Sequence, residues 1–578
     1  MKQLLRGLKD YRKEVILAPL FKMLEAMLEL LVPLVMKNII DRGIPAGDTG
    51  YIIRMSLVLL AIALVGLACA ITAQWFSAKA ATGFATKIRH DLFEHVQTLD
   101  FTELDRLGTS TLITRMTSDV NQIQNGVNLT LRLFLRSPFV VFGAMIMAFT
   151  IDTKTALIFL AVIPVLALVV FGIMLITRPM YQRVQAKLDR VTGRTRENLT
   201  GVRVIRAFGS EEEEETAFNQ ANEDLVKDQR AVGRISAFLN PVTYVIINFA
   251  ILLLVYTGAI RVEAGILTTG AVVALVNYMS QILVELIKLA DLIVQMTRAA
   301  ACGNRVEAIL EEGTEKERVV LEALTEDAGR NREAEASLYA VEFDHVSARY
   351  NESAEDALTD VSFRVKRGQT VGVIGGTGSG KTTLVQLIPG FYAASEGVVL
   401  VDGKNAADYD VRMLRAKSGI VLQKSVLFSG TVRENLLFAD PDADDETLLA
   451  ALKTAQALDF VEEKGGLSAR VEQGGRNFSG GQRQRLSIAR ALVKHPEILI
   501  LDDSASALDF ATDAALRQAI RDMAGDMTIF IVSQRTASVM NADRILVLDD
   551  GRLAGNGTHE ELLQSSPVYR EIYESQLK

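Results

Sequence analysis

A chain of 578 residues is too long for one hydrophobic core, so we expect two or more domains. Hydrophobic residues make up 49% and charged residues 23%, with a mean hydropathy of +0.22, which indicates a membrane part joined to a soluble part. The net charge of −8, without a basic stripe, argues against a nucleic-acid partner, and two cysteines support neither a disulfide framework nor a zinc site.

The N-terminal half carries the apolar segments. Its first thirteen residues hold five Lys or Arg but no short apolar core with a small-residue cleavage site, so we expect no cleaved signal peptide. Beyond them, six stretches reach the about 20 mainly apolar residues that a membrane-spanning helix needs. The six predicted spans are residues 15–40, 54–78, 128–150, 155–178, 237–260 and 268–296.

The distribution of basic residues predicts how these spans are oriented. The three short turns between spans each hold a single basic residue, namely Arg42, Lys154 and Arg261. By the positive-inside rule, the N-terminus and the two long, charged connections face the cytoplasm. An even number of spans then returns the chain to the cytoplasm, where ATP is present.

Charged side chains inside the predicted spans need an explanation, because charge is costly in hydrocarbon. Glu25 and Glu29 are four residues apart and share one helical face, and local ion pairs with lysines such as Lys22 are one explanation. A water-filled cavity for cationic or amphipathic substrates is the other. Side chains of spans five and six fit the wall of such a cavity, and fit hydrogen bonds between helices equally well; they include Tyr244, Asn248 and Tyr278.

A change of composition separates the two halves of the chain. Residues 297–337 are polar and acidic, with little hydrophobic periodicity in their second part. We therefore expect a helical membrane domain at residues 1–300, a linker at 301–337 and a soluble domain at 338–578.

The stretch Gly375–Thr382 matches the phosphate-binding pattern G-x-x-x-x-G-K-[ST]. An apolar, strand-like run precedes it at Thr370–Ile374 and a helix-like run follows at Thr383–Ile388, which is the context that phosphate binding requires. The glycines let backbone N–H groups close around phosphates at a helix N-terminus. We expect Lys381 to reach the β- and γ-phosphates and the Thr382 hydroxyl to bind Mg²⁺.

Further motifs accompany this loop in order along the soluble domain. Tyr350 lies between two strand-like runs, where its ring could stack on adenine, and Gln423 follows a strand-like run that could bring its amide to Mg²⁺ and the attacking water. Ser479 heads a helix as an N-cap, which is a second anion-binding device. The run Ile498–Asp502 is a buried strand that ends in a carboxylate, the usual Mg²⁺ partner of a phosphate loop.

With these motifs in this order, nearly the whole chain resembles an ABC exporter half-transporter. That resemblance implies an α-helical six-span transmembrane domain fused to an α/β P-loop nucleotide-binding domain, with coupling helices near Phe101–Leu107 and Ala207–Glu212 that touch the nucleotide-binding domains. Family members work as dimers, in which one chain's phosphate loop and the other chain's signature enclose each ATP. Their cofactors are ATP and Mg²⁺.

The resemblance also assigns roles to residues of this sequence. Tyr350 corresponds to the A-loop aromatic, and Thr382, Gln423 and the Walker B residue Asp502 to the Mg²⁺ ligands; Ser506–Asp509 is the D-loop. The implied ATP contacts of this chain's own loop are Gly375, Thr377, Gly378, Ser379, Gly380, Lys381, Thr382 and Thr383. The signature, which follows Phe478 where Leu is usual, would contact the partner's ATP through Ser479, Gly480, Gly481 and Gln482.

Two positions depart from the family pattern, and both handle the attacking water and the γ-phosphate. The family's catalytic glutamate is Asp503 here, and its H-loop histidine is Gln534. Aspartate is one methylene shorter, which withdraws the carboxylate by about 1.5 Å, and a misplacement of about 1 Å can cost on the order of 100-fold in rate. Gln534 can donate a hydrogen bond but has no titratable ring. We expect this site to bind ATP tightly and to hydrolyse it poorly.

The Asp-plus-Gln combination resembles the degenerate-site subunit of bacterial heterodimeric multidrug ABC exporters. It implies a multi-pass protein of the bacterial inner membrane that exports amphipathic drugs or lipids, with main hydrolysis at the site of a second, non-identical half-transporter. A homodimeric exporter of lipid or peptide and an ATP-gated regulatory ABC protein are the alternatives. The six apolar stretches and the missing basic face exclude a soluble ABC ATPase that acts on DNA or ribosomes.

Overall fold

The computed structural model describes residues 4–312, 338–350, 355–504, 508–523 and 525–577, and these form two compact units. The first unit comprises residues 1–94 and 110–311, and the second comprises residues 95–109 and 312–578. The final helix of the first unit runs to Leu310, into the stretch that we expected to be linker, whereas residues 313–337 lie outside the described part.

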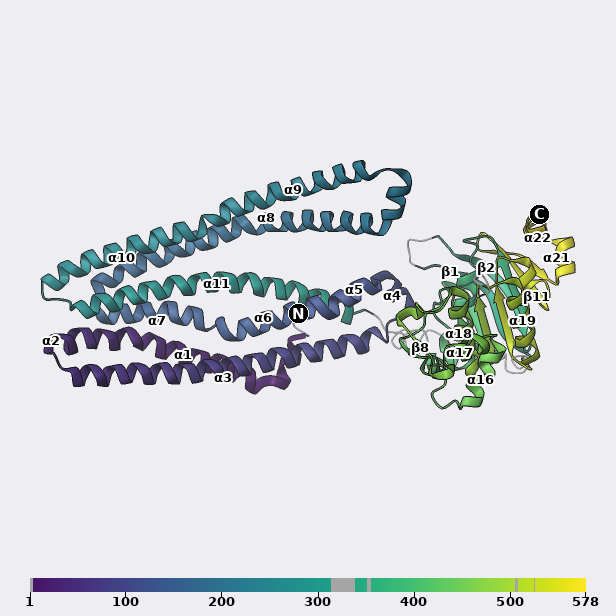
Figure 1. The fold of residues 1–578 in the computed structure, drawn as a ribbon, viewed down its shortest axis with the longest axis horizontal. Coiled ribbons are helices and arrows are strands. Elements are labelled where there is room, and N and C mark those ends of the chain that lie inside the picture. Colours follow the sequence, from purple (N-terminus) through teal and green to yellow (C-terminus); the bar gives the residue numbers. More distant parts are fainter. Residues whose placement is uncertain (1–3, 313–337, 351–354, 505–507, 524, 578) are drawn as a thin grey trace. The chain divides into compact units, whose positions relative to one another are not determined.

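The described residues of the first unit form helices joined by short connections, without a strand, and its long helices lie side by side (Figure 1). Helices α8 and α9 pack along each other as a hairpin, and α11 packs against α1, α6, α7, α8 and α10. The helices, together with short 3₁₀ and π segments, are α1 (Arg12–Asn38), α2 (Ile44–Ala46), α3 (Thr49–Val96), α5 (Thr109–Thr114), α6 (Val120–Leu133), α7 (Arg136–Ile151), α8 (Thr153–Phe208), α9 (Glu211–Ala237), α10 (Leu239–Glu263) and α11 (Thr269–Leu310).

Each of the six predicted spans falls on helix, but the count of six is not confirmed. In the described residues, five helical segments are long and apolar enough to cross a membrane. Helix α1, which holds the first predicted span, is not among them; it carries Lys22, Glu25 and Glu29 near its middle. The five segments are Thr49–Val96, Thr109–Ile151, Thr153–Phe208, Glu211–Glu263 and Thr269–Leu310.

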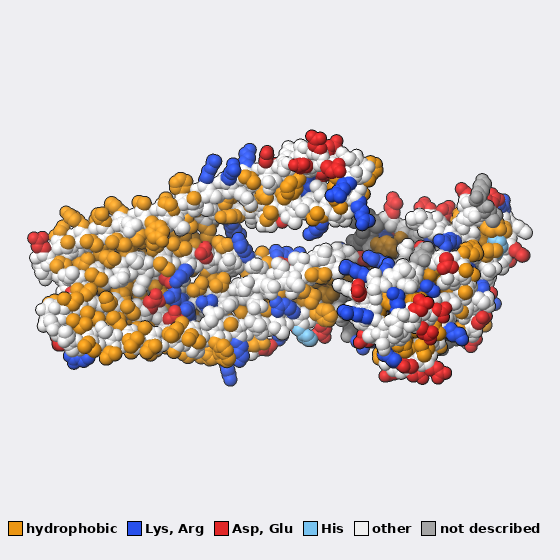
Figure 2. Space-filling model, in the orientation of Figure 1, with side chains coloured by type: hydrophobic (Ala, Val, Ile, Leu, Met, Phe, Trp, Pro, Cys, Tyr) orange, Lys and Arg blue, Asp and Glu red, His pale blue; other side chains and the backbone are white. Residues whose placement is uncertain are grey.

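The surface of this unit suits contact with lipid. Figure 2 shows hydrophobic side chains covering the part of the unit that holds the short turns, while acidic side chains gather at the end of the α8–α9 hairpin. On α3, Leu60, Leu64 and Leu67 are each more than half exposed. Such apolar exposure is unfavourable in water but suits the hydrocarbon layer.

The second unit is an α/β domain built on two larger sheets. A six-stranded sheet has the order β12-β11-β3-β10-β9-β6, and all its neighbouring pairs are parallel except β11 with β12. A four-stranded antiparallel sheet has the order β2-β1-β4-β5, and β7 pairs with β8. The strands are β1 (Tyr339–Ala348), β2 (Leu358–Lys366), β3 (Thr370–Gly375), β4 (Glu396–Val401), β5 (Lys404–Asn405), β6 (Ser418–Val421), β7 (Gly430–Thr431), β8 (Arg470–Val471), β9 (Ile498–Asp502), β10 (Thr528–Val532), β11 (Arg544–Asp549) and β12 (Arg552–Gly557).

Helices surround these sheets and complete the domain. Strand β9 is buried along its whole length, as its continuous apolar run predicts for a central parallel strand. The helices are α4 (Phe101–Leu107), α13 (Lys381–Leu387), α14 (Val411–Lys417), α15 (Val432–Leu437), α16 (Asp445–Thr454), α17 (Leu458–Glu463), α18 (Gly480–Val493), α19 (Phe510–Met523), α20 (Thr536–Val539), α21 (His559–Ser565) and α22 (Pro567–Leu577).

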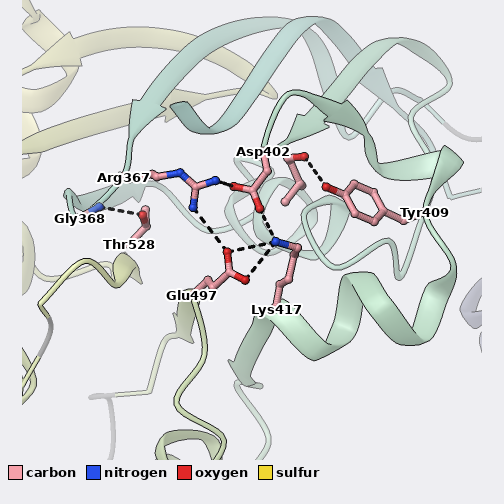
Figure 3. Close-up of polar contacts among 8 residues, drawn as sticks. Arg367, Gly368, Asp402, Tyr409, Lys417, Glu497 and Thr528 are labelled. Carbon is pink, nitrogen blue, oxygen red and sulfur yellow. Dashed lines mark hydrogen bonds and ion pairs between the residues drawn. The ribbon is translucent and has the colours of Figure 1, made fainter. Parts of the chain in front are cut away.

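A cluster of four charged side chains joins the two sheets (Figure 3). Asp402, which follows β4, accepts from Arg367 at 2.5 Å and from Lys417 at 2.6 Å. Lys417 also contacts Glu497, which precedes β9, at 3.0 Å. The cluster lies where β9 begins. It therefore stabilises the end of the parallel sheet that is opposite to the phosphate loop.

Candidate nucleotide-binding site

The phosphate loop connects strand β3 to helix α13, as the sequence predicted. Two of its glycines are required by close packing. Gly380 has φ +89°, and a Cβ at this position would lie 2.5 Å from the Ala357 carbonyl oxygen. A Cβ on Gly375 would lie 2.2 Å from the Leu548 carbonyl oxygen. Larger residues at these positions would push the loop away from the sheet.

The other side of the loop is open to a ligand. A Cβ on Gly376 or Gly378 would meet no atom within 4 Å, and Gly378 has φ +83°. The loop therefore offers backbone groups to an approaching anion at the start of α13, where the helix dipole favours negative charge. These features fit the triphosphate of a nucleotide.

Lys381 lies inside this loop and is only 9% exposed. Its ammonium group donates to the carbonyl oxygens of Gly375 at 3.0 Å and Gly376 at 2.5 Å. Burial lowers the pKa of Lys381, and the nearby Asp503 and Asp502 carboxylates oppose that shift. A triphosphate would add negative charge beside the ammonium group and favour its charged form.

Two of the predicted magnesium ligands contact each other at the carboxyl ends of the strands. The Thr382 hydroxyl donates to Asp502 Oδ1 at 3.1 Å, and Asp502 is 1% exposed at the end of β9. Burial raises the pKa of Asp502. A hydroxyl and a buried carboxylate are the oxygen donors that Mg²⁺ prefers, so the residues present fit the ion.

Asp503 occupies an unusual backbone conformation beside this pair. Its φ is +45°, which aspartate tolerates better than most residues, and its N–H donates to the Val532 carbonyl at 3.0 Å. The buried Gln484 amide donates to the Asp503 carbonyl at 3.2 Å. The Asp503 carboxylate accepts a long, 3.5 Å contact from the Gln423 amide, and burial raises its pKa. The side chain is thereby directed toward the nucleotide pocket.

Most of the predicted residues of this chain's own site line one pocket. Gln534 is among them, and its backbone carbonyl accepts from Gln576 Nε2 at 2.7 Å. Gly375 does not line the pocket but lies next to it, as the acceptor of the Lys381 ammonium. The lining residues are Tyr350, Ala357, Thr377, Gly378, Ser379, Gly380, Lys381, Thr382, Thr383, Gln423, Asp502, Asp503, Val532, Ser533 and Gln534.

Tyr350, the expected adenine-stacking residue, is fixed by two contacts. Its hydroxyl forms a 2.7 Å hydrogen bond with Thr383 Oγ1 on α13. Its ring meets the ring of Tyr392 edge-on, with centroids 5.0 Å apart. The side chain remains partly exposed at the pocket, and burial of the rest raises its pKa.

The signature residues do not line this pocket. Ser479 is the N-cap of α18 and forms a capping box with Gln482, and Gly480 and Gly481 open the helix. The residue before them, Phe478, is buried and packs against Phe460. The start of α18 is exposed and capped, so it is available to a ligand that is bound outside this chain's own pocket. Of the expected D-loop Ser506–Asp509, the first two residues lie outside the described part.

Several charged residues of the predicted spans, including Glu25 and Glu29, form ion pairs. Lys22 contacts Glu25 at 2.6 Å within α1, and Arg136 of α7 contacts Glu29 at 2.6 Å. Arg136 also pairs with Glu285 of α11, which in turn accepts from Lys288 at 2.9 Å and from Ser137 at 2.9 Å. These contacts favour the structural explanation of the intramembrane charges.

The aromatic and amide candidates of spans five and six differ in their surroundings. Tyr278 is fully buried, and its hydroxyl donates to the Leu30 carbonyl at 2.6 Å, so it bonds two helices together. Tyr244 and Asn248 are exposed on α10. A substrate cavity formed by Glu25, Glu29, Tyr244, Asn248 and Tyr278 stays a prediction.

Three contributors to the site escaped sequence analysis. Gln484 donates a hydrogen bond to the backbone carbonyl of Asp503, and Gln576 donates one to that of Gln534. The ring of Tyr392 packs edge-on against the ring of Tyr350. Gln484 has a detectable signal, because it is a long polar side chain on the mostly apolar buried face of a helix. Gln576 and Tyr392 have none, since their partners are distant in sequence.

The first predicted coupling segment coincides with a helix of the second unit. Helix α4 spans Phe101–Leu107, and Phe101 stacks on Phe391 with centroids 4.4 Å apart. The second predicted segment, 207–212, spans the end of α8 and the start of α9 in the first unit, where Phe208 is 81% exposed.

Comparison with known proteins agrees with this domain arrangement. Residues 15–286 match the ABC transporter transmembrane region, and residues 358–506 match the ABC transporter family model. An uncharacterized ABC transporter ATP-binding protein of Mycobacterium tuberculosis is 35% identical over 98% of this chain and 97% of its own. This chain belongs to the ABC transporter family. It is a half-transporter with fused membrane and nucleotide-binding domains.

Two further relatives of this ABC half-transporter carry names that describe transport. A putative multidrug export ATP-binding/permease protein of Bacillus subtilis is 31% identical over 99% of this chain and 98% of its own. An ATP-dependent lipid A-core flippase of Hahella chejuensis is 30% identical over 99% and 96%. The solved structure of a bacterial Atm1-family ABC exporter with ATP bound matches with a TM-score of 0.78 at 23% identity, covering 98% of both chains, and shows that the fold is shared.

Proposed function

We propose that this ABC half-transporter is one half of an ATP-driven exporter that moves amphipathic drugs or lipids out of the cytoplasm or the inner leaflet. Its own nucleotide site binds ATP tightly and hydrolyses it slowly. The named relatives, one a putative multidrug exporter and one a lipid flippase, support the substrate class. The exposed apolar side chains of the first unit support a place in the bilayer. The five basic residues of the N-terminus and the few in the short turns support a cytoplasmic nucleotide-binding domain.

The observation that carries the slow-hydrolysis proposal is Asp503 beside Asp502 in the nucleotide pocket. A glutamate there would place its carboxylate about 1.5 Å further toward the attacking water. Because a general base must lie within hydrogen-bond reach of that water, the shorter side chain slows proton abstraction. Gln534 compounds the effect, since its amide cannot exchange a proton as an imidazole can.

The remaining residues of the pocket retain what ATP binding needs. Lys381 contributes positive charge to the β- and γ-phosphates, and Tyr350 offers a ring to adenine. Thr382, Asp502 and Gln423 are the oxygen donors for Mg²⁺, which neutralises phosphate charge when bound. The site therefore holds the nucleotide while it lacks an effective base.

A transporter with one site that binds ATP but hydrolyses it slowly needs a second site that hydrolyses ATP rapidly. We therefore propose a non-identical partner half-transporter that carries the glutamate and the histidine. This chain's Ser479–Gln482 segment would close over the partner's ATP, since it is a capped helix start outside the chain's own pocket. The alternative is a homodimer in which both changes are tolerated.

Turnover of the chain alone and with its partner tests this proposal. The chain is purified by itself and together with the half-transporter encoded beside it, and both preparations are reconstituted into vesicles. We expect tight ATP binding and slow hydrolysis for the chain alone, and rapid hydrolysis with vectorial transport for the pair. Rapid hydrolysis and transport by the chain alone would establish the homodimer and refute the slow site.

A further inference from the structure

The Gln576 side chain of α22 bonds the segment that carries Gln534 at three points. Its amide nitrogen donates to the Gln534 carbonyl at 2.7 Å. Its amide oxygen accepts from the Thr536 N–H at 2.8 Å and from the Thr536 hydroxyl at 2.9 Å. A carboxamide has donors on its nitrogen and acceptors on its oxygen, so one side chain satisfies both partners. Gln576 therefore fixes Gln534 and Thr536 relative to α22.

The backbone of Gln534 is also held from the side of the parallel sheet. Ser533, which precedes it, donates its N–H to the Val373 carbonyl of β3 at 3.0 Å. The Ser533 hydroxyl accepts from the Arg535 N–H at 3.0 Å, which closes a local turn around Gln534. The Gln576 amide adds a contact from α22, outside the sheet. Gln534 thus lines the nucleotide pocket with its backbone held between β3 and α22.

Helix α22 is firmly attached where it supports this contact. Tyr569, near the start of the helix, is fully buried. It belongs to one hydrophobic cluster with Val539 of α20 and with Ile374, the residue that precedes the phosphate loop. Gln576 lies seven residues after Tyr569, which places both on the same face of α22. The face of α22 that packs on the core therefore also presents the Gln576 amide.

The position of Gln534 affects a nucleoside triphosphate more than a diphosphate. In the proposed site its side-chain amide donates to the γ-phosphate, which a diphosphate lacks. The base and the β-phosphate have other partners, among them Tyr350 and Lys381. Because a hydrogen bond weakens steeply when its geometry changes, release of the Gln534 backbone would weaken the γ-phosphate contact selectively.

We propose that Gln576 is a positioning residue that holds Gln534 for contact with the γ-phosphate, and that it thereby sets the preference of this site for ATP over ADP. The inference rests on the proposed ATP site and adds a determinant of its nucleotide selectivity. Gln576 lies on α22 and is not among the residues that line the pocket, so it acts through Gln534.

The test compares nucleotides with and without the γ-phosphate on the full-length chain. The chain is purified alone in lipid nanodiscs, so that every nucleotide site carries Gln534. Calorimetry measures the dissociation constants of Mg-ADP and of Mg-AMPPNP, an ATP analogue whose imido bridge prevents hydrolysis. Thermal unfolding of each variant is recorded alongside.

Two substitutions of Gln576 separate positioning from simple stabilisation. Gln576→Leu removes all three hydrogen bonds. Gln576→Glu keeps an acceptor for both groups of Thr536, but it replaces the donor to the Gln534 carbonyl by a carboxylate oxygen that repels this carbonyl. Gln564→Glu is the matched control, because it makes the same chemical change at an exposed position of α21.

We expect both Gln576 variants to weaken Mg-AMPPNP binding by about three- to tenfold, the change that loss of one hydrogen bond allows. Mg-ADP binding should not change, and Gln564→Glu should match wild type for both nucleotides. The unfolding temperature of Gln576→Glu should stay at the wild-type value, since the bonds to Thr536 are kept. In a Gln534→Ala background, Gln576→Glu should have no further effect, because its action passes through that side chain.

Three outcomes would overturn the inference. The first is wild-type selectivity in Gln576→Glu, which would reduce Gln576 to a structural role whatever Gln576→Leu does. The second is an equal loss for both nucleotides, and the third is a further loss of selectivity in the Gln534→Ala background. If the wild-type chain binds neither nucleotide, the proposed function is refuted as well. Normal wild-type binding with unaffected variants refutes the positioning role alone.

Discussion

The Arg136 guanidinium of α7 bonds the Glu29 carboxylate of α1 at 2.6 Å and also pairs with Glu285 of α11. One buried cation thus links three helices that are far apart in sequence. Arg136 is 6% exposed, so removing it would leave two carboxylates without their main partner in a medium of low dielectric.

We expect Arg136→Met to destabilise the membrane unit by about 3–5 kcal/mol, or to prevent its folding, because it breaks a buried ion pair on one side only. Arg132→Met, four residues earlier on α6, is the comparison variant. Denaturation of the purified protein in detergent measures the difference. Equal stability of both variants would contradict the structural role of Arg136.

Glu25 and Glu29 offer a test of the cavity explanation. If they bind substrate, Glu25→Gln with Glu29→Gln should reduce transport of cationic substrates more than that of neutral ones, with basal ATPase retained. The ion pairs described above predict instead an equal loss for all substrates. Transport of a matched cationic and neutral pair of compounds into inverted vesicles distinguishes the two results.

Lys381→Ala should weaken Mg-ATP binding at this chain's site by about 10- to 100-fold, because it removes a cation from the phosphates. Equilibrium binding of labelled ATP measures the loss. Lys366→Ala, an exposed lysine at the end of β2, is the control and should bind as wild type does. Abolition of ATP binding at both sites of the assembled transporter would contradict independent sites.

Ser479→Ala should slow turnover at the partner's site while leaving ATP binding at this chain's own pocket intact. The substitution also removes a helix cap, which costs about 1 kcal/mol in itself. Thr558→Ala is therefore the matched control, because Thr558 forms the same type of capping box at α21. If both variants retain full ATPase activity, the assignment of the signature to a shared site is wrong.

Asp503→Glu should raise hydrolysis at this site only modestly, and Asp503→Glu with Gln534→His should exceed the sum of the single effects, since both groups act on one transition state. Single-turnover hydrolysis of labelled ATP is the measurement. Stability is recorded alongside, because φ +45° at Asp503 disfavours glutamate. Asp503→Asn should change total ATPase much less than the Glu→Gln change in the partner; equal losses would contradict a degenerate site.

Asp402→Asn should lower the unfolding temperature of the nucleotide-binding domain, with a loss of about 1–2 kcal/mol, because Arg367 and Lys417 lose their shared carboxylate (Figure 3). Asparagine keeps the tolerance for the positive φ of this position. Thermal unfolding followed by circular dichroism checks this, and ATP affinity should stay unchanged because the cluster lies at the opposite end of the sheet.

The amino-acid sequence by itself determined the parts of this protein that local patterns encode. The loop Gly375–Thr382, the buried strand Ile498–Asp502 and the order of the surrounding motifs predict a strand–loop–helix nucleotide site, because each pattern spans only a few consecutive residues. Apolar length likewise predicted the membrane helices, although the charges of α1 leave the count of six unconfirmed.

Only the tertiary structure decided which distant side chains meet. The pairing of Arg136 with Glu29, the contact of Tyr392 with Asp105 and the association of residues 95–109 with the second unit depend on how helices rotate and pack. Hydrophobic periodicity defines which face of a helix is buried, but it does not define which other helix packs against that face. A charge in a span is therefore visible in the sequence, whereas its partner is known only when the helices are packed.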